Sequence, residues 1–157
     1  MDRGGHVRHA WLAVVAAAAA GLAGCGGPTV IRFQAGERVN QVQKDKPENT
    51  PANLMIFLLK DNASFNNASP EQLWSKEKAK AVLGADLAGE PRETTVNAGD
   101  PESKIDLGAL PADVRFVGVL ARLPKQDPPV TRHIAVKKDE ADDFPFLVVD
   151  YKLEVKK

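Results

Sequence analysis

The chain has 157 residues, of which 43% are hydrophobic and 27% are charged, and its 21 basic side chains balance 21 acidic ones. This balance excludes a nucleic-acid binder with a basic footprint, and the apolar content excludes a disordered chain. The single cysteine excludes an internal disulfide framework and a multi-cysteine zinc site, and the length suits one domain. Three histidines and one tyrosine add little catalytic chemistry, so the composition favours a binding or structural protein over an enzyme.

Residues 1–24 have the layout of a signal peptide. Arg3 and Arg8 precede the apolar run Ala10–Leu22. A helix over this run would extend only about 20 Å, whereas the hydrocarbon core of a bilayer is roughly 30 Å thick. The run is therefore predicted to be the core of a signal peptide and not a membrane span.

The next segment, Leu22-Ala23-Gly24-Cys25, resembles the bacterial lipobox. Small residues suit cleavage by a signal peptidase, and Cys25 is the side chain that would accept thioether-linked diacylglycerol. Each buried CH₂ contributes about 0.8 kcal/mol, so several acyl chains would anchor the protein stably. Because Gly26 and not an aspartate follows, the periplasmic face of the outer membrane is the predicted location. A plain secretory peptide with a chance cysteine is the alternative.

Residues 25–28 are predicted to form the lipidated cysteine and a short tether, and residues 29–157 a single domain. Its first strand is predicted over Thr29–Val42, where apolar residues alternate, and an exposed loop follows over Gln43–Pro51. Leu54–Leu59 is apolar at every position, which predicts a central strand covered on both faces.

A helical insertion is predicted at about residues 62–84. Ser69 is a suitable N-cap, with Pro70 in the first turn and Gln72 three residues after the cap, and Gly84 is a suitable C-cap. Phe65 is expected to plug into the core beside this helix. The predicted buried side consists of Leu73, Trp74, Ala81 and Val82.

Short strands are predicted over the rest of the chain, with turn signals between them. The last one has the cleanest alternation, in which Leu147, Val149, Tyr151, Leu153 and Val155 share one parity. About seven strands with this spacing predict a β-sandwich. The other segments are Thr94–Val96, Ile105–Leu107, Val114–Leu123 and Arg132–Lys137.

The order of these features resembles the TssJ (VasD-type) family of outer-membrane lipoproteins from type VI secretion systems. The distinctive segments are Leu54–Lys60, Leu83-Gly84-Ala85-Asp86-Leu87 and Phe116–Arg122. The resemblance implies a mainly β fold, a transthyretin-like two-sheet β-sandwich with a short helical insertion after the second strand.

The resemblance also implies an adaptor that binds the periplasmic domain of a TssM-like protein, and through it TssL, to anchor an envelope-spanning complex. Contact with the partner is implied for the loop between the first two strands, although a charged loop can also be a solvated connection. A polar loop suits an orientation-setting contact. The loop consists of Gln43, Lys44, Asp45, Lys46, Pro47, Glu48 and Asn49.

Other candidate sites have ordinary structural interpretations. Asp139–Asp143 is expected to be a solvated hairpin turn, with a hard-cation site as the alternative. His133 is interpreted as a surface residue and Trp74 as a core residue, with a ligand platform as the alternative for Trp74. We therefore predict no catalytic residue, metal, cofactor, small-molecule substrate or nucleic acid. The alternative function is a stand-alone periplasmic lipoprotein that binds a small ligand or an envelope polymer.

Overall fold

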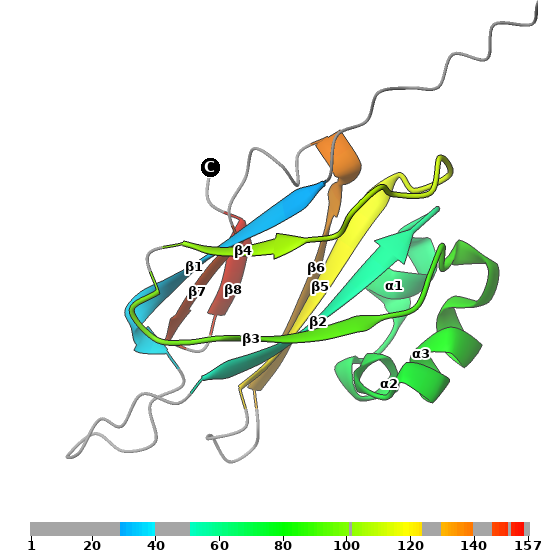
Figure 1. Cartoon of the computed structure of the whole chain (residues 1–157). Helices are drawn as coiled ribbons and strands as arrows, with labels where there is room; N and C mark the ends of the chain where they lie inside the picture. Colours follow the sequence, from blue (N-terminus) through cyan, green and yellow to red (C-terminus); the bar gives the residue numbers. More distant parts are fainter. Residues whose placement is uncertain are drawn as a thin grey trace, which may run out of the picture.

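The computed structural model describes residues 29–39, 51–100, 102–123, 130–139, 146–150 and 152–155. Within these residues, eight strands form two four-stranded sheets, and helices lie beside one of the sheets (Figure 1). This arrangement confirms the predicted fold class, a mainly β sandwich with a helical insertion after the second strand. Within the described residues, no helix has the length and the apolar composition of a membrane span.

The first sheet, sheet A, has the strand order β4-β1-β7-β8. Strand β1 pairs antiparallel with β4 and parallel with β7, and β7 pairs antiparallel with β8. The pairing of β1 with β7 shifts register between Ala35 and Val39, the segment that contains Gly36. The strands are β1 (Val30–Val39), β4 (Ser103–Asp106), β7 (Phe146–Asp150) and β8 (Lys152–Val155).

The second sheet, sheet B, is antiparallel throughout and has the strand order β3-β2-β5-β6. Its two inner strands pair over seven residues, from Asn53 opposite Arg122 to Leu59 opposite Phe116. The strands are β2 (Ala52–Leu59), β3 (Arg92–Val96), β5 (Phe116–Leu123) and β6 (Val130–Lys137).

The main core fills the space between the two sheets. Phe33 of β1 stacks on Phe146 of β7 with the ring centroids 5.3 Å apart. Alternate residues of each strand point into this layer, as expected for strands with one buried face. From sheet B it receives Leu54, Ile56, Val117, Val119 and Ala121, all at most 1% exposed.

A second core lies between sheet B and the helices, which is why β2 is apolar at both parities. Met55, Phe57 and Leu59 point into this second layer, whereas Leu54 and Ile56 point into the first. Strand β2 is flanked by β3 and β5, so the prediction of a central strand covered on both faces is confirmed.

The insertion consists of three short helices and a 3₁₀ turn rather than one long helix. Ser69 forms the predicted capping box with Gln72, and Gly84, at φ +49°, ends the last helix. The prediction of one continuous helix is wrong because Ser75 adopts an extended conformation and caps a new helix. The elements are α1 (Ala63–Asn67), α2 (Pro70–Trp74), α3 (Lys76–Leu83) and η1 (Gly84–Asp86).

The break at Ser75 also changes which residues are buried. Leu73 is buried as predicted, but α3 buries Ala79 and Leu83 instead of Ala81, which is exposed. A helical face predicted from one 3.6-residue period loses its phase when an extended residue interrupts the helix. Trp74 and Val82 are only partly buried.

The last predicted strand is in fact a hairpin. Strands β7 and β8 are antiparallel, with Phe146 opposite Val155 and Val149 opposite Lys152. The buried residues are Phe146 and Val148 in β7 and Leu153 in β8, so the buried parity changes between the two strands. The alternating pattern continues across the reversal, and periodicity alone therefore does not reveal the turn.

Candidate functional site

The predicted site residues lie outside the described part of the chain. This applies to Cys25 and to the loop residues 43–49. The structure does describe the residues that flank them, namely Thr29 after the tether, Val39 before the loop, and Pro51 after it. These flanking residues are the described positions nearest to the two predicted sites.

The residue that follows the tether is held at one end of the sandwich. Thr29 is 6% exposed, and its backbone N–H donates to the carbonyl of Gly108 at 3.1 Å. The N–H of Leu107 in turn donates to the carbonyl of Thr29 at 2.8 Å. Two backbone hydrogen bonds therefore fix the start of β1 against the segment that follows β4.

The flanks of the loop lie at the opposite end. Val39 pairs with Asp150 at the end of β7, and Ala52 pairs with Val96 at the end of β3. Strand β1 has ten residues, and a strand rises about 3.3 Å per residue, so it separates the two ends by roughly 30 Å. Figure 1 shows β1 running along the sandwich from the blue end to the cyan end.

The turn between β3 and β4 is held against β1 by backbone hydrogen bonds, near the end of β1 that leads to the predicted loop. The N–H of Ala35 donates to the carbonyl of Asp100, and the N–H of Gly99 donates to the carbonyl of Gly36, both at 3.0 Å. The Asp100 carboxylate accepts from the Ser103 hydroxyl at 3.0 Å. Gly99 has φ +77°, a conformation that favours glycine. The β3–β4 connection is thus fixed to β1.

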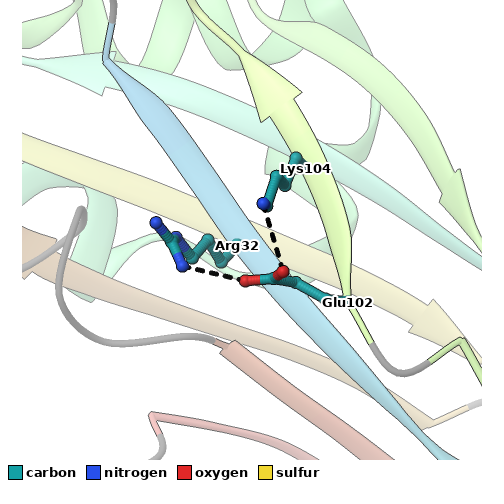
Figure 2. Close-up of polar contacts among 3 residues, drawn as sticks. All are labelled: Arg32, Glu102 and Lys104. Carbon is teal, nitrogen blue, oxygen red and sulfur yellow. Dashed lines mark hydrogen bonds and ion pairs between the residues drawn. The ribbon is translucent and has the colours of Figure 1, made fainter.

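The outer face of sheet A carries a small exposed ion network. Figure 2 shows Glu102 between two cations, with one carboxylate oxygen 2.9 Å from Arg32 and the other 3.2 Å from Lys104. The hydrogen bond from Lys104 is the main cause that lowers the pKa of the Glu102 carboxyl, and the nearby charges of Lys104 and Arg32 lower it further. Exposed pairs of this kind contribute little to stability.

His133 lies between sheet B and the insertion, an environment that its place in the sequence does not reveal. Its ring makes an edge-on contact with Phe65 of α1, with centroids 5.2 Å apart, and it is partly buried. The interpretation of His133 as an ordinary surface residue is therefore wrong. Phe65 is fully buried, as predicted, against Phe57 on β2.

The acidic segment Asp139–Asp143 does not connect the two strands of a hairpin. It follows β6 of sheet B and precedes β7 of sheet A, so the chain crosses between sheets there. Asp139 is exposed, and the other four residues lie outside the described ranges. Among the described residues, no group of three histidine, cysteine or carboxylate side chains is placed to hold a metal ion.

Solved structures with the same fold come from type VI secretion systems. Serratia marcescens Lip, described as a membrane-bound component of that system, is 21% identical to this chain. The two structures superpose with a TM-score of 0.67, and the match covers 83% of this chain and 98% of Lip. The lipoprotein TssJ1 from Pseudomonas aeruginosa is 19% identical, with a TM-score of 0.60, covering 83% and 97%. A structure described as the TssM C-terminal domain from EAEC contains a chain that is 20% identical, with a TM-score of 0.60, covering 84% and 99%.

A family model gives the more specific result. No curated protein matches the chain significantly. The model described as type VI secretion lipoprotein, VasD, EvfM, TssJ matches residues 28–156, most of the chain and all of its described strands. The protein therefore belongs to the TssJ family of type VI secretion lipoproteins.

Proposed function

We propose that this chain is a lipid-anchored outer-membrane adaptor that binds the periplasmic domain of a TssM-like protein. Through that partner, and indirectly through TssL, it would anchor the envelope-spanning membrane complex of a type VI secretion system. Family membership supports the role in secretion. The lipobox ending at Cys25 and the glycine after it support the outer-membrane location.

The observation that carries the proposal is the arrangement of the two ends of β1. Thr29, four residues after Cys25, is fixed at one end of the sandwich, and Val39, four residues before the loop, lies at the other. A body tethered to the membrane near Thr29 can therefore direct the loop end into the periplasm. A partner anchored in the inner membrane would approach from that side.

The packing favours an adaptor over the alternative, a stand-alone lipoprotein that binds a small ligand. Small-molecule sites are concave and mostly apolar, with a few converging polar groups. Here buried apolar side chains occupy the layer between the sheets, and Phe33, Leu54, Val119 and Phe146 are each 0% exposed. A filled sandwich leaves its surface and loops as the parts that recognise a partner.

The proposal is tested by separating anchoring from binding. We expect the Cys25→Ser variant to be lost from the outer-membrane fraction, because several acyl chains supply the membrane affinity. In a pull-down with the purified periplasmic domain of the TssM-like protein from the same genome, the same variant should bind as well as the lipidated protein in detergent. The lipidated wild type is the control for both measurements.

Two results would contradict the proposal. If neither form binds the periplasmic domain, the adaptor function is wrong. If the Cys25→Ser variant remains in the outer-membrane fraction, the anchor is not the cysteine-linked lipid.

A further inference from the structure

One transverse row of sheet B is polar on the face that otherwise carries the helices. Asn53 on β2 pairs with Thr95 on β3 and with Arg122 on β5, and all three residues are exposed. The next row toward the helices contains Met55 and Leu120, which are 1% and 0% exposed. The outer face of sheet B thus changes from buried apolar to exposed polar within two residues.

Trp74 marks the boundary between these rows. Trp74 is the last residue of α2 and is only partly buried. The guanidinium carbon of Arg122 lies over its ring, 5.2 Å from the ring centroid. Among the described residues, no carboxylate pairs with Arg122, although the exposed lysines Lys60, Lys80 and Lys104 each have one. A planar guanidinium held over an aromatic ring can still donate its N–H groups to a partner.

The row is contiguous with the flank of the predicted partner loop. Asn53 comes two residues after Pro51, and it lines the same surface depression as Trp74 and Thr95. A stable protein interface involves about 20–30 residues on each side. The seven-residue loop at positions 43–49 is too small to supply such a surface alone. A partner on the loop must therefore contact neighbouring surface as well.

We propose that Asn53, Trp74, Thr95 and Arg122 form a second part of the partner-binding surface. This inference rests on the proposed function, because the occupant is the same periplasmic domain of the TssM-like protein. The chemistry calls for an acidic side chain on that domain, since a guanidinium fork binds a carboxylate with two parallel hydrogen bonds. Tryptophan and arginine are also the side chains most enriched among residues that dominate binding energy.

The test compares two arginines on opposite outer faces. Arg122→Gln removes the charge from the proposed surface, and Arg32→Gln removes one from the outer face of sheet A. Both residues are exposed, and Glu102 keeps Lys104 when Arg32 is replaced, so both variants should fold. Binding to the purified periplasmic domain would be measured by isothermal titration calorimetry with the full lipidated chain in detergent.

We expect Arg122→Gln to weaken binding by about tenfold or more and Arg32→Gln to leave it unchanged. Trp74→Leu should weaken binding too, with circular dichroism to establish that the insertion remains folded. If Arg122→Gln binds like the wild type, or if both arginine variants lose affinity equally, the second surface is wrong while the adaptor function stands. If the wild-type chain does not bind the domain, both proposals fail.

Discussion

Gly118 is the residue that allows the helical insertion to pack against sheet B. It lies on β5, and a Cβ placed there would be 2.8 Å from Cζ of Phe65 and 3.1 Å from Cδ1 of Leu59. Phe65 is the fully buried residue of α1. The ring of a helix residue thus occupies the space that any side chain at position 118 would need.

We therefore expect Gly118→Ala to lower the free energy of unfolding by about 1–3 kcal/mol, because overpacking forces the Phe65 ring or the sheet to shift. Chemical denaturation followed by circular dichroism measures the change. Gly89→Ala is the matched control, since a Cβ there would meet only Leu58 at 3.9 Å, an ordinary contact distance. It should stay within about 0.5 kcal/mol of the wild type. Equal losses in both variants would show that packing at Phe65 is not the cause.

At the level of elements, Ser75 decides where the helices of the insertion begin and end. Its extended backbone ends α2, and its hydroxyl accepts from the N–H of Lys78 at 3.4 Å while donating to Glu77 at 2.9 Å. The acidic Glu77 also lies in the positively polarised first turn of α3, where a negative charge is favourable. One serine therefore ends one helix and starts the next.

Replacing this cap should cost a predictable amount of stability. We expect Ser75→Ala to lower the free energy of unfolding by about 1 kcal/mol, because the capping hydroxyl is lost. Ser75→Gly should cost only about 0.3 kcal/mol, since glycine is also accepted at N-cap positions. Urea denaturation of the three proteins gives this order directly. If alanine were as stable as serine, α2 and α3 would be held apart by packing alone.

Sequence patterns predicted the elements whose signals are local. The capping box at Ser69 and the apolar run of β2 are of this kind, because each depends on neighbouring residues. The reversal between β7 and β8 was missed because alternation at period two continues across it. The break at Ser75 was missed because the apolar residues on both sides still fit one helical face.

At the level of the whole molecule, the sequence predicts a lipobox and a partner loop, but not which strands lie beside the residues that flank them. The strand predicted over Thr29–Val42 already separates Thr29 from Val39, but its pairing with β4 and β7 depends on segments far along the chain. The pair of Trp74 and Arg122 is equally hidden, because 48 positions separate them and only the packing of α2 on β5 brings them together. Contacts between distant segments depend on topology.

The two ends of the loop are anchored independently, and this leads to the last prediction. Val39 belongs to sheet A and Ala52 to sheet B, and each is held by its own strand partner. Replacing Lys44–Glu48 with a Gly-Ser segment of equal length should therefore leave the fold intact. Losing Pro47 adds freedom mainly to the unfolded chain, at a cost of up to about 1 kcal/mol, so the melting temperature should fall by no more than about 4 °C.

The same replacement should weaken binding to the periplasmic domain by about tenfold or more, as expected when central contact residues are removed.

A second variant separates the effect of charge from that of loop shape. It changes Lys44 and Lys46 to Gln, Asp45 to Asn and Glu48 to Gln, and it keeps Pro47. If charge mainly steers the encounter, this variant should slow association and lose the salt dependence of its rate, with little change in dissociation. Surface plasmon resonance at two salt concentrations resolves both rates. A collapse of thermal stability in either variant would instead make the loop part of the sandwich structure, and full binding by both would place the contact elsewhere.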